Sequence, residues 1–417
     1  MIPRKLYAPD QGNNNAASGA AQAKSPVERA LQTQQSLDAI KSGPETARNI
    51  GTVSFAAGRP VNLEIPNDTC IKRAIASIKA YGTFAYASGT PLISPMGVFS
   101  RLVPSMSIIA DGARYIKTLD LYVYRLFNAL AWGSYPVRTY RTGAGIAATT
   151  RLGTIDWRSG PAALGATTQD AVFNESCMIN FEIPQLYKPG HESVTQFFTA
   201  NVSKALAVFN CSSADRLLED GNTAPLVISS FGADISMDII ENREGTVENN
   251  AFDFVETVTD ESYQAPVSQK VYRLNTGNKL AGIGVFTRNG DTNQRPSDIA
   301  ITDLTLKLNG SKDIQTLNFL RKNWANKDRY SIGDDSWGTY VSGGAVSSHP
   351  SQGFAYINLI KNGDISSGLG TKFSDKVSDV QLLVTTALAS GVDAATYTNP
   401  VQMQVLQQMI AEVQIKQ

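Results

Sequence analysis

The sequence contains few of the residues that most often carry out enzyme chemistry. It has two histidines, His191 and His349, and neither has a cysteine or a second histidine at the spacing of metal ligands. It also lacks the Gly-x-Ser-x-Gly pattern that presents a nucleophilic serine on a strand-to-helix turn. Both histidines stand in loop-like contexts, KPGHESV and SSHPS, so we interpret them as solvated loop side chains. The sequence therefore predicts no catalytic, cofactor-binding or metal-binding residue and a protein that is not an enzyme.

An excess of positive charge is also missing. The chain has 37 Lys and Arg residues and 37 Asp and Glu residues, so its formal net charge is zero. Proteins that grip nucleic acid usually neutralise several phosphates and carry a clear cationic excess. We therefore expect no direct sequence-specific binding to nucleic acid.

Paired cysteines and long apolar runs are absent too. The three cysteines, Cys70, Cys177 and Cys211, are an odd number without Cys-x-x-Cys spacing, which favours reduced and mostly buried thiols over a disulfide framework. No run of 18 apolar residues could form a membrane-spanning helix, and the first residues lack the apolar centre of a signal peptide. These observations predict a soluble protein that is made in a cytoplasm.

Three short motifs suggest ligand binding only weakly. The segments 142–153 and 281–286 each contain Gly-x-Gly, but neither has the strand-to-helix context of a dinucleotide-binding loop or the lysine of a phosphate-binding loop. We interpret them as loop or strand glycines. Asp334 and Asp335 could bind a cation, but the spaced oxygen ligands of a calcium loop are missing, so a turn is favoured.

What the sequence does contain is a succession of short β-type segments. From residue 51 onwards, runs rich in β-branched and aromatic residues alternate with loops rich in Gly, Ser, Pro and Asn, as in TVSFAAGRPVNLEIP and PLVISSFGADISMDII. After about residue 250 the same pattern returns, as in FDFVETV, KLAGIGVFTR and FAYINLI. Many short strands without long helices between them predict an all-β sandwich or barrel.

The same turn and following segment occur twice. DGARYIKTL (111–119) aligns with NGSKDIQTL (309–317), with identical Gly, Ile, Thr and Leu residues. The preceding segments, 61–79 and 270–288, also agree, since each reads as a strand, a polar turn and a second strand. An Asp-Gly or Asn-Gly step suits a tight turn because both central residues tolerate positive φ. We predict two copies of one β-domain, each with a strand, a tight turn and a short amphipathic helix.

The helix after the turn is expected from the spacing of apolar residues. Leu119, Val123, Leu126 and Leu130 recur at helical spacing in the first copy. In the second copy the corresponding residues are Ile314, Leu317, Leu320 and Trp324. A long polar segment follows each helix, at 133–175 and 327–352, and we expect both segments to be outer loops.

The two ends of the sequence differ from the β-rich part. Residues 1–49 are predicted to form a flexible N-terminal arm with a helix at about 25–42, because Ser25, Pro26 and Glu28 form an N-terminal helix signal. The first β-domain then spans 50–246 and the second spans 247–398. For residues 399–417 a C-terminal helix is predicted from one apolar stripe, and its single lysine, Lys416, favours packing on protein over binding to lipid. The stripe consists of Met403, Leu406, Ile410 and Val413.

This pattern resembles one family of viral proteins. The residues that carry the resemblance are LEIPNDTCIKRAIASIKAYGTF (63–84) and FSRLVPSMSIIADGARYIKTLDLYVYRLFNAL (99–130), together with the second copy from 271 onwards. They are similar to the double jelly-roll major capsid proteins of tailless icosahedral viruses, especially bacteriophages with an internal membrane. The resemblance covers about 50–400 and rests on this order of strands, turns and helix.

The resemblance implies a structural protein of the virion, made and assembled in the host cytoplasm. Its fold would be two tandem jelly-roll β-sandwiches, and three chains would form a homotrimer of pseudo-hexagonal outline that tiles an icosahedral capsid. Expected partners are further copies of the chain, neighbouring capsomers, penton or minor capsid proteins and, through the N-terminal arm, an underlying viral membrane.

Two alternatives remain open on sequence grounds. A phage spike or receptor-binding protein with tandem β-sandwiches shares the same all-β composition. A β-sandwich enzyme that acts on carbohydrates could stack sugars on aromatic side chains, although no pair of carboxylates for cleaving a glycosidic bond stands out. The aromatic residues in question are Trp132, Trp157, Trp324 and Trp337.

Overall fold

The structure is a computed structural model of the 417-residue chain, and it describes eighteen stretches of it. These are residues 45–86, 92–93, 98–132, 138–143, 153–154, 162–163, 168–182, 195–219, 226–242, 252–263, 269–275, 277–288, 300–310, 312–319, 321–322, 353–360, 379–385 and 401–412. The helix predicted at 25–42 and the outer loop predicted at 327–352 lie outside them.

Strands dominate the described residues, as the sequence predicts. In the first half of the chain they are β1 (Glu45–Ser54), β2 (Pro60–Ile65), β3 (Cys70–Tyr86), β4 (Leu92–Ile93), β5 (Ser105–Ala110), β6 (Arg114–Asp120), β7 (Arg138–Gly143), β8 (Gly153–Thr154), β9 (Ala162–Ala163), β10 (Thr168–Asn180), β11 (Phe197–Phe198), β12 (Ala205–Asn210), β13 (Leu218–Glu219) and β14 (Leu226–Asn242). In the second half they are β15 (Phe252–Tyr263), β16 (Gln269–Arg273), β17 (Lys279–Arg288), β18 (Asp303–Leu308), β19 (Lys312–Asn318), β20 (Phe354–Asn358), β21 (Val380–Thr385) and β22 (Val401–Glu412). The helical elements are α2 (Val98–Leu102), α3 (Leu121–Trp132) and the 3-10 turns η2 (Thr199–Asn201) and η3 (Ala214–Leu217).

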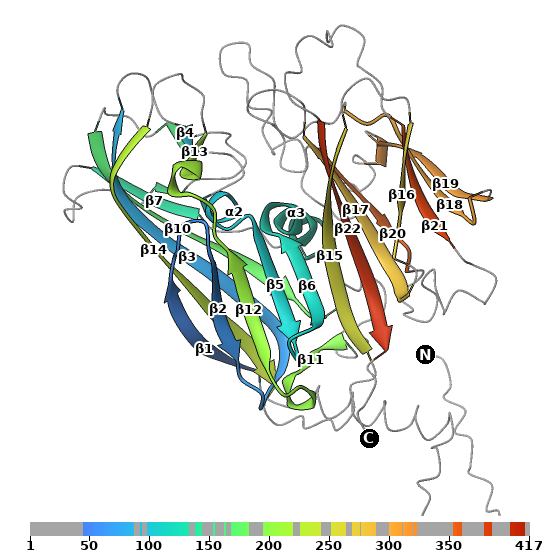
Figure 1. The fold of residues 1–417 in the computed structure, drawn as a ribbon, viewed down its shortest axis with the longest axis horizontal. Coiled ribbons are helices and arrows are strands. Elements are labelled where there is room, and N and C mark those ends of the chain that lie inside the picture. Colours follow the sequence, from blue (N-terminus) through green and yellow to red (C-terminus); the bar gives the residue numbers. More distant parts are fainter. Residues whose placement is uncertain are drawn as a thin grey trace, which may run out of the picture.

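The strands form two sandwiches that share one sheet (Figure 1). A seven-stranded sheet with the order β1-β14-β3-β10-β7-β8, with β11 beside β3, is one layer of the first sandwich. Facing it is an eight-stranded sheet with the order β2-β12-β5-β6-β15-β22-β17-β20. The last four strands of that sheet belong to the second sandwich, whose other layer is the four-stranded sheet β16-β21-β18-β19. The short strands β13-β4-β9 form a separate small sheet.

The strand order of the two sandwiches confirms the predicted duplication. The order β1-β14-β3-β10 in the first corresponds to β15-β22-β17-β20 in the second, and β2-β12-β5-β6 corresponds to β16-β21-β18-β19. Even the irregularities repeat: β3 has a bulge between Ile71 and Arg73, and β17 has one between Leu280 and Gly282. These positions are equivalent in the alignment of 61–79 with 270–288. Two copies of one sandwich explain this agreement.

The repeated turn has the conformation predicted for it. Asp111 and Gly112 have φ values of 53° and 75°, and Asn309 and Gly310 have φ values of 49° and 69°. All four values lie in the left-handed region, which Asp, Asn and Gly tolerate better than other residues. The two copies therefore use the same tight hairpin turn.

Each turn is also fixed to its neighbouring strand by two hydrogen bonds of its Asp or Asn residue, one from the backbone and one from the side chain. Asp111 N donates to the carbonyl oxygen of Lys204 at 2.8 Å, and Asp111 Oδ1 accepts from the backbone N–H of Ser203 at 2.7 Å. In the second copy, Asn309 N donates to the carbonyl oxygen of Asp379 at 2.8 Å, and Asn309 Oδ1 accepts from the backbone N–H of Asp379 at 3.3 Å. An Asp or Asn side chain at this position therefore holds the hairpin against the strand that pairs with it.

The helix predicted after each turn begins later than the sequence pattern indicated. A second strand, β6 or β19, follows the turn directly, and α3 starts only at Leu121. Asp120 Oδ1 caps α3 by accepting from the N–H groups of Tyr122 and Val123 at 2.9 and 3.0 Å. Asn318, nine residues after Asn309 as Asp120 is after Asp111, accepts from the N–H of Arg321. The prediction placed Leu119, Ile314 and Leu317 in a helix, although they lie in β6 and β19, because a strand and a helix merge into one apolar pattern.

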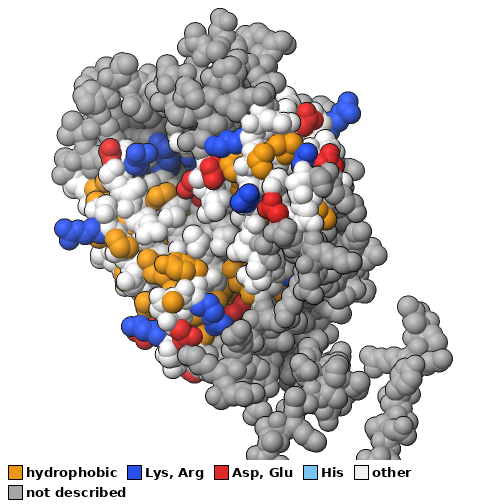
Figure 2. Space-filling view, turned by 45° about the vertical axis from the view of Figure 1, so that its right-hand side comes forward, with side chains coloured by type: hydrophobic (Ala, Val, Ile, Leu, Met, Phe, Trp, Pro, Cys, Tyr) orange, Lys and Arg blue, Asp and Glu red, His pale blue; other side chains and the backbone are white. Residues whose placement is uncertain are grey.

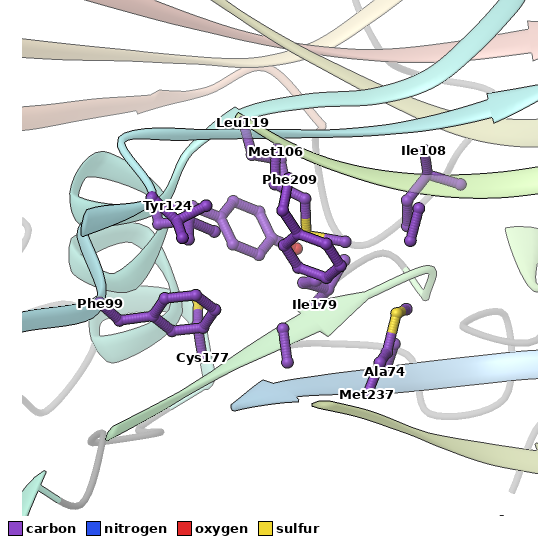
Figure 3. Packing of buried hydrophobic residues seen from close by; sticks show 14 of the residues in the cluster. Ala74, Phe99, Met106, Ile108, Leu119, Tyr124, Cys177, Ile179, Phe209 and Met237 are labelled. Atoms are coloured by element: carbon purple, nitrogen blue, oxygen red, sulfur yellow. The ribbon is translucent and has the colours of Figure 1, made fainter. Parts of the chain in front are cut away.

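The first hydrophobic core lies between the two layers of the first sandwich and extends to α3 (Figure 3). Side chains from β3, β10 and β14 meet side chains from β5, β6 and β12, and burial of each large one contributes about 1.5–3 kcal/mol. Members of this core include Ala74, Phe99, Met106, Ile108, Leu119, Tyr124, Cys177, Ile179, Phe209 and Met237. A second core fills the second sandwich, between β15-β22-β17-β20 and β16-β21-β18-β19.

The C-terminal helix predicted at 399–417 is wrong, because residues 401–412 form strand β22. β22 lies between β15 and β17 and pairs with both in antiparallel register. A central strand that is covered on both faces is buried continuously, so its apolar residues need not alternate. Residues 403–410 are all buried, which allowed the same residues to fit a helical stripe.

Two further expectations need shorter bounds. The arm predicted at 1–49 overlaps the first sandwich, because β1 begins at Glu45 and pairs with β14 along its whole length. The outer loop predicted at 133–175 contains β7, β8, β9 and the first part of β10, and β7 and β8 extend the seven-stranded sheet. The boundary predicted at 246/247 falls between β14 and β15, and the division into 50–246 and 247–398 otherwise stays a prediction.

Candidate functional site

A group of buried charged and amide side chains joins the two sandwiches, and we call it the seam. Strand β6 of the first sandwich pairs in parallel with β15 of the second through only two residue pairs, Lys117 with Glu256 and Thr118 with Thr257. Helix α3 packs beside this joint, against β20 and β22 of the second sandwich (Figure 1). Because two backbone pairs are a short joint, the side chains around them decide how firmly the sandwiches are held together.

At the centre of the seam is a fully buried ion pair. Lys117 Nζ lies 2.6 Å from Glu256 Oε2, and both side chains are 0% exposed. The other carboxylate oxygen, Glu256 Oε1, accepts from Gln408 Nε2 at 2.6 Å, and Tyr356 Oη donates to Gln408 Oε1 at 2.6 Å. A buried pair offsets its desolvation only when such additional hydrogen bonds are present. Burial lowers the pKa of Lys117, and the carboxylate of Glu256 opposes that shift.

Aromatic rings enclose the ammonium group of this pair. Lys117 Nζ lies 4.2 Å from the ring centroid of Phe254 and 5.3 Å from that of Phe181. Phe254 lies on β15, and Phe181 directly follows β10 of the facing sheet. The rings attract the cation and keep water away from it. Lys117 thus contacts both layers of the first sandwich and the second sandwich.

A second polar group lies near the end of β6. Asp120 uses one carboxylate oxygen to cap α3, and its Oδ2 accepts from Gln404 Nε2 at 2.7 Å. Gln404 Nε2 also donates to Asp260 Oδ1 at 2.6 Å, and Arg288 lies 3.8 Å from Asp120 Oδ2. Burial raises the pKa of Asp120, and the positive charge of Arg288 opposes that shift. One carboxylate therefore positions the helix and binds the second sandwich.

A third charged contact lies at the other end of β6. Arg114 and Asp253 form an ion pair at 3.0 Å, in which Asp253 is buried and Arg114 is partly exposed. Burial raises the pKa of Asp253, and Arg114 opposes that shift most strongly. Arg114, Lys117 and Asp120 thus each reach from β6 to an oppositely charged residue of the second sandwich.

The seam shows the features of a joint between two surfaces. Within the described ranges, no three His, Cys, Asp or Glu side chains lie close enough to hold a metal ion. No helix among the described residues is long and apolar enough to cross a membrane. The seam places opposite charges and amides in pairs, an arrangement that fixes the register of two surfaces.

Most of the residues considered in the sequence lie elsewhere. His191, His349, Asp334, Asp335, Trp157, Trp324 and Trp337 are outside the described residues, and Trp132 ends α3. The buried thiols are confirmed, since Cys70, Cys177 and Cys211 are all free and buried. Burial raises the pKa of the Cys177 thiol to about 12. These cysteines belong to the packed interior and not to a reactive site.

The glycines of AGIGVF lie in a strand, as predicted. Gly282 and Gly284 are both in β17. A methyl group on Gly282 would lie 2.2 Å from Tyr356 Oη, and one on Gly284 would lie 3.0 Å from the Phe354 ring. The glycines therefore leave space for aromatic side chains of the neighbouring strand β20, which pack towards α3.

Sequence reasoning missed the seam residues, although one signal pointed to them. In the aligned repeat, Lys117 and Asp120 of the first copy correspond to the neutral Gln315 and Asn318 of the second. In the part of the chain that the structure describes, the first copy's strand meets another sandwich and the second copy's strand does not, which accounts for the charges in the first copy alone. A difference between two otherwise matching copies was the available clue.

Comparison with known proteins identifies the fold. No protein-family model matches the sequence, and no curated protein matches it significantly. Among solved structures, the major capsid protein of Sulfolobus turreted icosahedral virus has a TM-score of 0.54 at 12% identity, covering 89% of this chain and 97% of that one. The major capsid protein P2 of bacteriophage PM2 has a TM-score of 0.50 at 9% identity, covering 89% of this chain and 98% of that one. The chain is thus similar over nearly its whole length to double jelly-roll proteins, and its fold is a double jelly roll.

Proposed function

We propose that this chain is the major capsid protein of an icosahedral virus. The observation that carries the proposal is the pair of equivalent jelly rolls held in one shared sheet, the same fold as two major capsid proteins. A structural role, without catalysis, agrees with a site made of matched charges. In the virion the chain would form the capsid shell, after synthesis in the host cytoplasm.

Trimerisation is supported by the free edges of the two sandwiches. The seam joins β6 to β15, and the equivalents of these strands in the other copy are β19 and β1. Within the described residues, β19 pairs only with β18, and β1 pairs only with β14. Among the described residues, the equivalents of the two strands that meet at the seam thus each have one edge without a partner strand.

Repeating the seam between chains would produce a closed ring. A contact between two different edges is heterologous, and it closes into a ring when the rotation between units permits. Three chains supply six jelly rolls, so seam-like contacts from β19 of one chain to β1 of the next would give a trimer of pseudo-hexagonal outline. Such trimers would then tile the shell.

The surface beside the proposed contact between chains is less apolar than the surface beside the seam. In the second sandwich, Phe286 and Phe354 on the face towards α3 belong to the first hydrophobic core. The strand register makes Ser77 and Ser176 their equivalents in the first sandwich. A polar surface suits a contact between subunits that are first soluble on their own. Figure 2 shows that basic and acidic side chains are interspersed on the face in view.

The edge contact can be tested by transferring the charge pair of the seam. Gln315 and Ala47 are the equivalents of Lys117 and Glu256, and both are exposed in the single chain. We expect native mass spectrometry to show trimers for the natural chain. Gln315→Lys or Ala47→Glu alone should weaken the trimer, because each buries an unpaired charge. Both substitutions together should restore it.

Val271→Lys serves as the matched control, because Val271 is exposed on β16, at the opposite end of the four-stranded sheet from β19. This variant should still form trimers. A natural chain that stays monomeric under all assembly conditions would overturn trimerisation. Trimers that tolerate both single charges would instead overturn the proposed edge contact.

Further partners follow from the same proposal. We propose contacts with neighbouring capsomers and with penton or minor capsid proteins, and contact of the N-terminal arm with an underlying membrane. Because β1 begins at Glu45, deletion of residues 1–44 should leave both sandwiches folded and impair assembly. Normal particles from the deleted chain would exclude a structural role for the arm.

Copy number separates this proposal from a phage spike or receptor-binding protein. A shell protein dominates the protein mass of a particle, whereas a spike is a minor component. Gel electrophoresis of purified particles would decide between them, and a minor band would contradict the capsid proposal.

A further inference from the structure

We propose that Lys117 and Glu256 react with each other to form an amide cross-link between the two jelly rolls. This inference goes beyond the capsid proposal and does not depend on it, since it concerns one chain alone. It assigns a self-modification site to the centre of the seam.

The backbone holds the two reacting groups together. Lys117 and Glu256 are directly paired in the parallel joint of β6 and β15, and their terminal atoms lie 2.6 Å apart. Both side chains are fully buried, so water does not compete for either group. Holding two reactants in contact removes most of the entropic barrier to their reaction.

The surroundings of Nζ favour the uncharged amine that the reaction requires. An ion pair and a neutral amine with a neutral carboxylic acid contain the same number of protons, so one proton transfer interconverts them. The phenyl rings of Phe254 and Phe181 lie beside Nζ, and burial lowers the pKa of Lys117. A desolvated, neutral lysine amine is a nucleophile.

The bond changes balance without another reactant. The Nζ lone pair attacks Cδ of Glu256, and negative charge develops on Oε1. Gln408 Nε2 donates to that oxygen at 2.6 Å, and the Tyr356 hydroxyl holds the Gln408 amide in this orientation. A proton passes from Nζ to Oε2, the bond between Cδ and Oε2 breaks, and this oxygen leaves as water. The products are one amide bond and one water molecule.

The reaction is confined to this position in the duplicated chain. In the other pair of equivalent edges, Gln315 replaces Lys117 and Ala47 replaces Glu256, so neither an amine nor a carboxyl group is present. The cross-link would join the jelly rolls of one chain and leave separate chains unlinked. A joint of two backbone pairs would thereby become covalent.

Intact mass spectrometry of the denatured full-length chain tests the proposal. We expect a mass lower than the sequence mass by one water molecule, and a protease digest that contains one branched peptide joining Lys117 to Glu256. This measurement needs only the natural chain, so it does not depend on whether a variant folds. The sequence mass together with two linear peptides, from chain shown to be folded, would overturn the proposal.

Two variants test whether the mass deficit of one water molecule depends on Lys117. Lys117→Arg keeps the positive charge beside Glu256 but removes the amine nucleophile, because arginine stays protonated. It should have its full sequence mass. Lys270→Met is the matched control, since Lys270 lies 3.7 Å from Glu261 in a partly exposed pair, and it should keep the mass deficit. A deficit that persists in Lys117→Arg would place the modification elsewhere and refute the assignment.

Discussion

Replacing Gly282 with alanine should destabilise the second jelly roll through a single crowded contact. The added methyl group would lie 2.2 Å from Tyr356 Oη and 2.8 Å from Gln408 Oε1, which is closer than such atoms approach one another. Tyr356 must then move, and its hydrogen bond to Gln408 is lost. Overpacking of this kind costs about 1–3 kcal/mol, and a buried polar group left without its partner costs about 1–3 kcal/mol.

One effect opposes this loss of stability. Alanine restricts the unfolded chain more than glycine does, which stabilises the fold by about 0.4–1 kcal/mol where the conformation allows it. The crowding is larger, so we expect Gly282→Ala to lower the free energy of unfolding by about 2–4 kcal/mol. Gly284→Ala should lower the free energy of unfolding by less, because its methyl group would lie 3.0 Å from the edge of the Phe354 ring.

Urea denaturation at one fixed protein concentration measures these changes. A shift of the midpoint at constant slope reports a change in stability, and a fixed concentration keeps any association of chains constant. Tyr356→Phe removes the oxygen atom nearest to the added methyl group. The loss in the Gly282→Ala/Tyr356→Phe double variant should therefore be smaller than the sum of the two single losses. Losses that add within about 0.5 kcal/mol would refute the proposed contact, because additivity indicates independent sites.

Three further predictions concern a carboxylate, the turns and the thiols. Burial raises the pKa of Asp120, so the folded chain binds a proton at this carboxylate more tightly than the unfolded chain does. The free energy of unfolding should therefore fall as the pH rises from about 4 through the raised pKa. Asp120→Asn should reduce this slope in denaturation measured across that range. Gly112→Ala and Gly310→Ala should each cost about 1–2 kcal/mol in thermal denaturation because both residues have left-handed φ, and clearly unequal losses would contradict the equivalence of the turns. None of Cys70, Cys177 and Cys211 should react with a thiol reagent in the folded chain, and all should react after unfolding, since burial raises the pKa of each; a thiol titrated under native conditions would disprove their burial.

The duplicated fold was predictable because its signals are local. An Asp-Gly or Asn-Gly step demands a particular backbone conformation, and the structure shows that conformation at both Asp111 and Asn309. The strands around each turn carry β-branched residues, which are enriched in strands. Such features survive in the sequence even when the rest of the two copies has diverged.

The seam and strand β22 were not predictable from local pattern. Gln404 and Gln408 are buried because they bond to Asp120 and Glu256, which are far away in the sequence. In isolation, a strand with buried amides and apolar residues on both faces has no period of two, and Met403, Leu406 and Ile410 also fit a helix. Residues 401–412 form a strand because they pair with β15 and β17.

The position of β22 has a consequence for protein synthesis. This strand is encoded last among the described residues, yet it lies in the middle of a sheet, between β15 and β17. Residues 401–412 must therefore have left the ribosome before the second jelly roll can close. A chain that ends before Val401 would leave one edge of β15 and one edge of β17 without their partner strand. Closure of the second jelly roll therefore depends on the last described strand of the chain.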